Sequence, residues 1–164
     1  MRPALLLFSL LLTLSFAAFA TQAPILHDIE IEGSPESPQL SISDLKLEVN
    51  HEYLFVINNP HGVPLVFQYE KLGQNVTTQY LQGSPSVTQE SINLLPNGKV
   101  LWHFMTTAEG EFTVYVINPS LMQKGETRKI SIVDPVKQAE LEKTAAEVAA
   151  IKREKPKYRS RIKS

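Results

Sequence analysis

The side chains of this sequence that suit metal binding are four histidines and three methionines, and the chain contains no cysteine. Imidazole and thioether groups together favour the soft Cu(I) ion. The candidate ligands are His61, His103, Met105 and Met122. Because cysteine is absent, disulfides, iron–sulfur clusters, cysteine-ligated zinc and thiol catalysis are excluded.

Motifs of the common enzyme classes are missing. No serine lies in a Gly-x-Ser-x-Gly elbow, the seven glycines form no phosphate-binding loop, and no His-x-x-x-His pair occurs. Glu109 and Glu111 flank Gly110 and could act as paired carboxylates. A solvated turn is the favoured interpretation, because nothing nearby predicts the burial that would raise one pKa. We therefore expect a protein that is not an enzyme.

Residues 1–20 have the features of an export signal. They contain one charged residue, Arg2, then a long apolar run, and they end in the small-x-small pattern Ala18-Phe19-Ala20. We expect cleavage and a periplasmic location in a bacterium, since a protein without cystines depends on burial and backbone pairing alone. An uncleaved membrane anchor is the alternative, although the apolar run is at the short limit for a membrane span.

The charges are balanced over the whole chain but not along it. Sixteen Lys and Arg residues against 17 Asp and Glu residues give a net charge of -1, which argues against a nucleic-acid-binding protein. Residues 21–134 carry six basic and 13 acidic residues, whereas residues 135–164 carry nine and four. The mature chain is therefore an acidic body with a basic tail.

The body alternates between apolar and polar positions, with many β-branched and aromatic residues. The clearest examples are residues 26–32, 40–43 and 45–49. The other candidate strands are residues 53–57, 63–69, 91–95, 100–105, 112–117 and 129–133. This pattern predicts an all-β antiparallel sandwich of seven or eight strands over residues 21–134. The polar stretch 73–89 has too weak a pattern for an assignment.

The pattern changes at Asp134-Pro135, where aspartate suits the N-cap and proline the first helical position. We predict a helix over residues 135–155, followed by a disordered basic tail over 156–164. Its thin apolar stripe consists of Leu141, Ala145, Val148 and Ile151.

Basic residues gather at the end of the chain: Lys152, Arg153, Lys155, Lys157, Arg159, Arg161 and Lys163. They favour contact with an anionic membrane surface or with a periplasmic partner protein. A solubilising extension, or one that folds back on the acidic body, is the alternative. No nucleic-acid partner is expected, and the protein should be a monomer.

Several segments of the body resemble a cupredoxin, one of the small Greek-key copper proteins of the periplasm. The segments are Trp102-His103-Phe104, residues 109–116, Met122-Gln123-Lys124-Gly125 and the closing strand 130–133. Upstream, residues 53–59 resemble the strand that leads to the first copper histidine. The resemblance covers residues 40–133 approximately and implies a cupredoxin-like Greek-key β-sandwich.

The resemblance also implies positions for a type-1 copper set, and this chain departs from most of them. The cysteine position falls on Val116, the first histidine position on Leu65, and the second on Pro119 or Ser120. Only Met122 matches a ligand, and it is the weak axial one. A blue-copper centre requires the thiolate of a His2Cys site. An ordinary blue-copper electron carrier is therefore excluded.

A weaker site made of histidine and methionine remains an alternative. The resemblance places His61 and Met122 in loops at the same end of the sandwich. His61 also suits a simple turn, and Met122 suits gap filling in the core. His103 should point to solvent if its neighbours Trp102 and Phe104 point inward.

These observations favour an exported binding or accessory module without a type-1 copper site and without a required cofactor. In this interpretation Leu65 and Val116 fill the former metal end. The first alternative is a periplasmic protein that binds or carries Cu(I) through Met122 and His61, with Met105 as a further ligand. The second alternative is an Ig-like adhesin or assembly domain.

Overall fold

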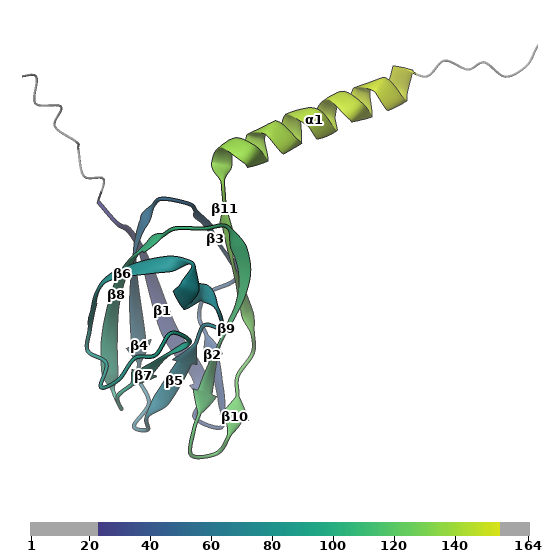
Figure 1. The fold of residues 1–164 in the computed structure, drawn as a ribbon. Coiled ribbons are helices and arrows are strands. Elements are labelled where there is room, and N and C mark those ends of the chain that lie inside the picture. The colour runs from purple at the N-terminus through teal and green to yellow at the C-terminus, as the bar shows by residue number, and fades with distance from the viewer. Residues whose placement is uncertain (1–22, 155–164) are drawn as a thin grey trace, which may run out of the picture.

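The structure is a computed structural model and describes residues 23–154. The expected signal at residues 1–20 and the expected tail at residues 156–164 lie outside the described residues. Within them, the chain forms two β-sheets packed face to face, followed by a long helix (Figure 1). The all-β sandwich with a C-terminal helix is confirmed.

The first sheet contains five strands and lies on one side of the sandwich. In spatial order they are β2 (Ser37–Leu40), β1 (Ile25–Ser34), β4 (Glu52–Asn59), β8 (Gly98–Thr106) and β6 (Val76–Gln82). β1 runs parallel to β4, and the other neighbours are antiparallel.

The second sheet faces the first. Its path is β3 (Leu45–Glu48), β11 (Arg128–Val133), β9 (Gly110–Asn118), β5 (Leu65–Gln68) and β7 (Ser91–Leu94), and β10 (Gln123–Lys124) also pairs with β9. β3 runs parallel to β11. Sequence neighbours such as β3 and β4 thus lie in different sheets, so the chain crosses repeatedly between the layers.

The described residues contain eleven strands rather than the expected seven or eight. One addition is β6, which arises from the stretch 73–89 that was left without an assignment. Another is the two-residue β10. The strand predicted at 40–43 was wrong in its bounds, because β2 contains Pro38, ends at Leu40 and is not continued over residues 41–43. Proline is tolerated there because β2 is an edge strand and does not need every ladder hydrogen bond.

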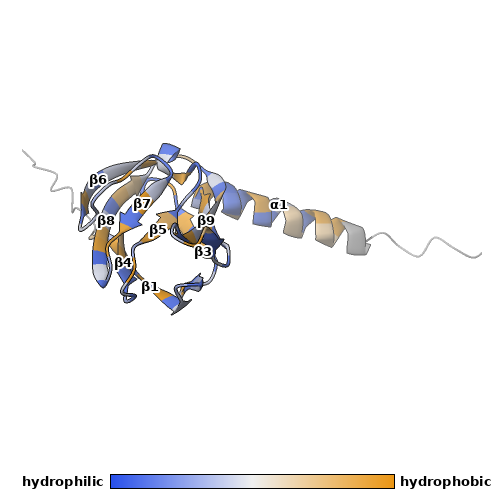
Figure 2. Ribbon diagram, turned by 90° about the horizontal axis from the view of Figure 1, so that it is seen from below, coloured by the Kyte–Doolittle hydropathy of each residue, from blue (hydrophilic) through white to orange (hydrophobic). Residues whose placement is uncertain are grey.

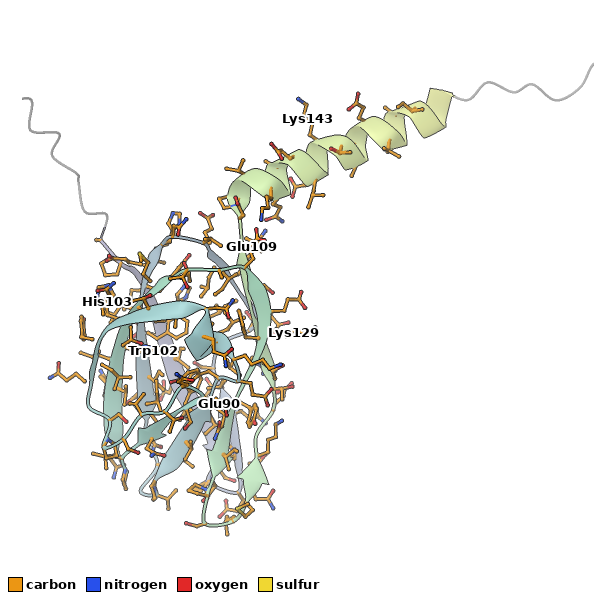
Figure 3. All side chains as sticks on the ribbon, in the orientation of Figure 1. Glu90, Trp102, His103, Glu109, Lys129 and Lys143 are labelled. Carbon is orange, nitrogen blue, oxygen red and sulfur yellow. The ribbon has the colours of Figure 1, made fainter. Side chains whose placement is uncertain are left out.

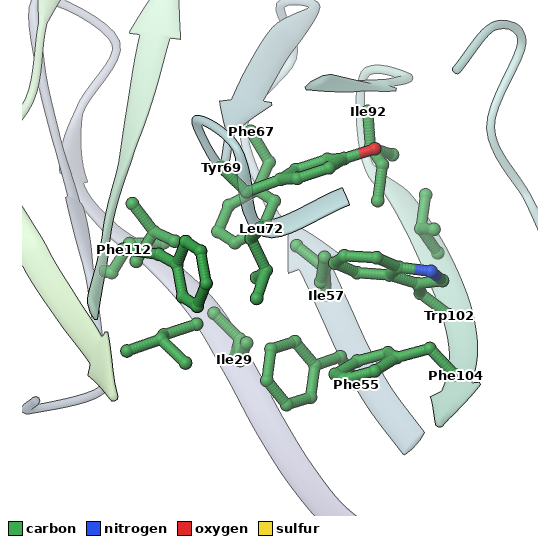
Figure 4. Close-up of a cluster of buried hydrophobic side chains, with 14 of the residues drawn as sticks. Ile29, Phe55, Ile57, Phe67, Tyr69, Leu72, Ile92, Trp102, Phe104 and Phe112 are labelled. Atoms are coloured by element: carbon green, nitrogen blue, oxygen red, sulfur yellow. The ribbon is translucent and has the colours of Figure 1, made fainter. Parts of the chain in front are cut away.

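Strand alternation builds one apolar core between the sheets. Along β4 and β8, every second side chain is buried. In the ribbon coloured by hydropathy, hydrophobic segments occur in the strands of both sheets (Figure 2). Aromatic rings fill the centre: the Trp102 ring centroid lies 4.5 Å from that of Phe104 and 4.7 Å from that of Tyr69 (Figure 4). Aromatic pairs at such distances stabilise a core beyond simple area burial.

Two polar contacts hold the less regular segments against this core. The indole Nε1 of Trp102 donates to Oγ1 of Thr78 on β6 at 3.0 Å. The Tyr69 hydroxyl donates to the Thr88 carbonyl at 2.7 Å, and burial raises the pKa of Tyr69 to about 12. Both ends of the unassigned stretch are therefore attached by hydrogen bonds from buried aromatic residues.

The helix α1 (Pro135–Glu154) extends away from the sandwich (Figure 1). As predicted, Asp134 caps it, accepting the N–H of Val136 at 2.9 Å on its carboxylate. Lys137 in the first turn forms an ion pair with Glu109, with Nζ and Oε2 3.0 Å apart. None of the helices within residues 23–154 has both the length and the apolar composition that crossing a membrane requires.

Candidate metal centre

The strands that the resemblance connects with copper meet at one end of the sandwich. β4 ends there at Asn59, β9 ends there at Asn118, and β5 begins there at Leu65. A backbone hydrogen bond of 2.8 Å from the N–H of Asn97 to the carbonyl of His61 joins two of the loops. We call this region the loop end. It comprises the loops at residues 35–36, 60–64, 95–97 and 119–122, together with Leu65 of β5 and Val116 of β9 beside them.

Asn59 is a buried polar residue that joins two loops. Its Nδ2 donates to the carbonyls of Val63 at 3.0 Å and of Leu95 at 2.9 Å. Its Oδ1 accepts the N–H of His61 at 3.1 Å. Because a buried amide without partners is costly, these bonds explain how Asn59 is accommodated and what fixes the loop that contains His61.

Asn118 repeats this arrangement at the end of a strand in the second sheet. Its Nδ2 donates to the carbonyl of Pro35 at 2.8 Å, and its Oδ1 accepts the N–H of Ser120 at 3.0 Å. The contact with Pro35 attaches the β1–β2 turn to the loop that follows β9. Side-chain amides thus hold the loop end together by contacts to backbone groups.

The positions that correspond to the copper cysteine and first histidine are filled by aliphatic residues. Leu65 and Val116 each have 0% of their surface exposed. Leu65 pairs with Leu94 of β7, and Val116 pairs with Phe67 of β5. As expected from the sequence, both belong to the apolar core. Neither can donate an electron pair to a metal ion.

His61 lies at the loop end and is half-buried. In the described part of the chain, its Nε2 atom is buried and has no hydrogen-bond partner. A hydrogen bond from the Ser34 side chain is the main cause that lowers the pKa of Glu36, and the proximity of His61 makes the smallest contribution to that lowering. His61 is therefore more than a solvated turn residue, because one of its ring nitrogens is buried.

Met122 is at the same end but in a different environment. It is 84% exposed and adopts a left-handed backbone conformation with φ of 53° in the turn before β10. The reading of Met122 as a core gap filler is therefore wrong. A thioether in open solvent is a poorly oriented ligand, because nothing around it fixes its rotamer.

The other two candidate ligands, His103 and Met105, lie on the outer face of β8 toward its far end. Trp102 and Phe104 point inward as predicted, so His103 points outward (Figure 3). Its side chain nevertheless retains only 15% exposure. The Nε2 of His103 lies 3.1 Å from Oε2 of Glu52, and the Tyr80 ring contacts the imidazole edge at a centroid distance of 5.1 Å.

The four candidate ligands therefore form two separate pairs. Residues 23–154 contain no group of three or more His, Cys, Asp or Glu side chains that could hold a metal ion together. A type-1 centre requires a thiolate and two imidazoles. The resemblance assigns the cysteine position to Val116, the first histidine position to Leu65, and the second to Pro119 or Ser120. The donor set does not fit type-1 copper.

Sequence reasoning missed the structural importance of Asn59 and Asn118. Each is followed by proline, and the repeated Asn-Pro dipeptide at the ends of two predicted strands was the available signal. It also missed Glu52, the partner of His103, because cross-strand register between β4 and β8 cannot be read from one sequence.

Comparisons with known proteins agree with this description of the fold. No family model and no curated protein matches the chain. Among solved structures, the McoA multicopper oxidase of Aquifex aeolicus has a TM-score of 0.52 and 6% identity, over 68% of this chain and 30% of that one. The copper-containing nitrite reductase NirK of Thermus scotoductus has a TM-score of 0.50 and 12% identity, over 70% and 32%.

A multi-copper oxidase of Pediococcus acidilactici gives a TM-score of 0.50 at 16% identity, over 68% of this chain and 27% of that one. The chain thus spans under a third of the length of each of these three proteins. Structural similarity at such low sequence identity shows a shared fold and nothing further. The chain has the cupredoxin-like fold but lacks the cysteine of a type-1 copper site.

Proposed function

We propose that this protein is an exported cupredoxin-like binding module that carries no type-1 copper and acts through contact with a partner protein or a membrane surface. The observation that supports this proposal is the apolar filling of the loop end. Leu65 and Val116 are fully buried there, and side-chain amides join the surrounding loops.

The chemistry of the loop end argues against electron transfer. Strong electronic coupling and a tuned potential at a type-1 centre depend on a copper–thiolate bond, and no cysteine exists to form one. Packing aliphatic side chains at such positions stabilises the fold and leaves the outer surfaces free for contact. The module therefore serves as a rigid support for surface residues.

Copper titration of the chain from residue 21 onward tests this proposal. We expect neither visible thiolate-to-copper absorption nor stoichiometric tight binding of Cu(II) or Cu(I) by calorimetry. A blue-copper protein titrated under the same conditions is the positive control. Tight binding of one copper ion per chain would overturn the proposal.

One observation favours a second function, the binding of Cu(I). The buried Nε2 of His61 has no hydrogen-bond partner among the described residues, and an enclosed neutral imidazole nitrogen is a competent ligand for a soft metal. Met122 at the same end would supply a thioether, whereas Met105 lies toward the opposite end of β8 and is no longer a candidate for this site.

The double substitution His61→Ala and Met122→Leu tests this second function. If it is correct, the pair of changes abolishes Cu(I) affinity while the melting temperature of the metal-free protein stays nearly constant. The matched control is His51→Ala, which removes an imidazole that contacts the Val49 carbonyl at 3.1 Å. Unchanged Cu(I) affinity in the double variant would eliminate the candidate.

A further inference from the structure

We infer that the outer face of the first sheet binds a segment of another protein that has an apolar centre flanked by lysine or arginine. We call this surface the outer sheet face. It consists of the side chains of β1, β4, β8 and β6 that point away from the second sheet. The inference rests on the proposed function, since it names the surface through which the binding module acts and the chemistry of its partner.

The two central strands of the first sheet are apolar on both faces. Their inward side chains form the core, whereas Leu54 and Val56 of β4 and Leu101 and Met105 of β8 point outward and are half-buried. Antiparallel strands with one face in solvent usually alternate between apolar and polar residues. Within residues 23–154, the second sheet covers only the inner face, and α1 extends away from the sandwich (Figure 1). β4 and β8 therefore have the composition of strands covered on both faces, while their outer face is open.

Strand register joins the outward apolar side chains into one patch. Across β1, β4, β8 and β6, one row consists of Leu26, Leu54, His103 and Tyr80. Val56 pairs with Leu101 in the next row. Leu26 and Tyr80, at the two sides of the patch, are 55% and 45% exposed. Single exposed apolar residues are ordinary, but a contiguous exposed patch marks an interaction site.

The outer face of the second sheet provides a comparison within the same molecule. Its outward side chains are mostly polar, among them Gln68, Asn93, Thr113, Tyr115 and Ser131. The apolar exceptions are Val66 and Ile117, which pair with each other, and Val133. A sheet face of this composition is stable in water without a partner. The apolar patch thus distinguishes one side of the sandwich from the other.

Acidic side chains flank the patch on the side of β1. Asp28, Glu30 and Glu32 alternate with buried isoleucines, so they lie on the outer sheet face, and all three are exposed. Glu52 at the start of β4 lies on the same face, opposite Met105. The charges around an interface favour a partner of opposite sign. The flank therefore favours lysine or arginine beside the apolar centre of the partner.

Charge also separates this partner from other surfaces that could cover the patch. A two-fold dimer uses the same patch of both copies, so it would bring two acidic flanks into one interface. The strands of the first sheet contain one lysine or arginine, Lys99, to offset them. An anionic bilayer would be repelled by Asp28, Glu30 and Glu32. A basic segment with an apolar stripe satisfies both the patch and its flank.

A model peptide supplies this chemistry in a binding experiment. The probe is an amphipathic helix of leucine and lysine with about 14 residues, hence about 21 Å long. Its matched control has glutamate in place of every lysine. With the chain from residue 21 onward, fluorescence anisotropy of labelled peptides should show at least about tenfold tighter binding of the lysine peptide, and a smaller difference in high salt. Equal affinity for both peptides, or binding of neither, would overturn the inference.

Substitutions in the patch determine whether the peptide binds there. Leu54→Gln with Leu101→Gln should weaken binding by about tenfold or more, because apolar burial drives the contact. The matched control, Val66→Gln with Ile117→Gln, makes the same kind of change at half-buried positions on the other sheet. It should leave binding nearly unchanged. Equal losses in the two variants would contradict docking on the outer sheet face.

Leu26→Gln with Tyr80→Gln tests the patch at its most exposed positions, where substitutions have little effect on folding. This variant should weaken binding by about threefold or more. Fluorescence of the buried Trp102 verifies that each variant keeps its folded body. Unchanged affinity in this variant would overturn the inference even if the two leucine substitutions prevented folding.

Asp28→Asn with Glu30→Gln tests the acidic flank. The variant should bind the lysine peptide about threefold or more weakly, with a reduced dependence on salt. Glu111→Gln with Glu140→Gln is the matched control, because it removes the same charge from exposed positions elsewhere. Equal weakening in the two variants would show that the peptide responds to net charge alone, and it would reject the flank.

Two further measurements distinguish the other occupants. A dimer that Leu54→Gln with Leu101→Gln abolishes would show that a second copy covers the face. Binding to phosphatidylglycerol vesicles that is lost in the same variant would show that a lipid surface does. Either result would overturn the inference. The copper titration is independent: absent peptide binding with absent copper binding would reject this inference and leave the proposed function standing.

Discussion

Asn59 and Asn118 end strands in opposite sheets with the same Asn-Pro dipeptide and the same hydrogen-bond pattern. In each case Oδ1 accepts the backbone N–H two residues later, at 3.1 Å and 3.0 Å. In each case Nδ2 donates to a carbonyl of a neighbouring loop. The loop end is thereby closed by two equivalent amide clamps, one from each layer of the sandwich.

Removing either clamp should destabilise the fold. Asn59→Ala leaves two carbonyls and one N–H without their partner, and Asn118→Ala leaves one of each. Because an unpaired buried polar group costs about 1–3 kcal/mol, each variant should lose stability of that order, with the greater loss for Asn59. Urea unfolding followed by Trp102 fluorescence measures this. Asn58→Ala, on the outer face of the same strand, is the control, and losses equal to that of the control would contradict the clamp.

Leu65 and Val116, the buried aliphatic residues at the loop end, should contribute to the free energy of unfolding as other core residues do. Leu65→Ala removes a fully buried side chain and should cost about 2–5 kcal/mol, from lost burial and from the cavity left behind. Leu121→Ala is the matched control at the same end, since Leu121 is 48% exposed, and it should cost less than about 0.5 kcal/mol. Similar midpoints for the two variants in denaturant would show that Leu65 is not a core residue.

Much of the fold could be predicted because burial repeats with the period of the strand. Ile29 and Ile31 of β1 are buried between exposed acidic residues, and the same alternation of apolar and acidic residues is visible in the sequence. β6 could not be predicted in this way. Its residues Thr77 to Tyr80 are all exposed, so hydrophobicity carries no signal, and its position depends on the distant contact from Trp102 to Thr78.

The candidate site could be predicted only in part for a similar reason. The absence of cysteine and the burial of Val116 follow from residue type and alternation. The enclosure of His61 and the exposure of Met122 depend on loop conformation, which local sequence does not fix. The separation of His103 and Met105 from the loop end depends on the direction of β8 within the sheet.

His27 should make stability fall in mild acid. Its ring is packed between Tyr53 and Phe55, with centroid distances of 6.0 Å and 5.6 Å, and burial lowers its pKa below the usual 6.5. The unfolded chain therefore binds a proton more readily than the folded one, so this contribution is complete above pH 6.5 and is lost as the pH falls through the lowered pKa.

The difference in unfolding free energy between the native protein and His27→Gln isolates this contribution. Measured from pH 8 to pH 5, the native protein should lose more stability than the variant as the pH falls. His51→Gln serves as the comparison, because it removes a histidine that is not sandwiched between core aromatic rings. Parallel curves for the native protein and His27→Gln would contradict the assignment.

The ion pair between Lys137 and Glu109 should control the direction of α1 more than the stability of the body. Glu109 hydrogen-bonds the ammonium and raises the pKa of Lys137. Both side chains are largely solvent-exposed, and exposed pairs contribute at most about 1 kcal/mol. Lys137→Gln should therefore barely change the unfolding midpoint, while it removes the side-chain contact that orients the first helical turn.

Energy transfer from Trp102 to a dye on α1 measures this orientation. The natural chain has one tryptophan and no cysteine, so Ala150→Cys provides a single labelling position. We expect a broader distribution of distances in Lys137→Gln than in the parent, and the same broadening in the parent at high salt, which screens the pair. Lys143→Gln changes a lysine farther along the helix and should leave the distribution unchanged. If all three proteins give one narrow distribution, backbone contacts at Asp134, rather than the ion pair, set the direction of the helix.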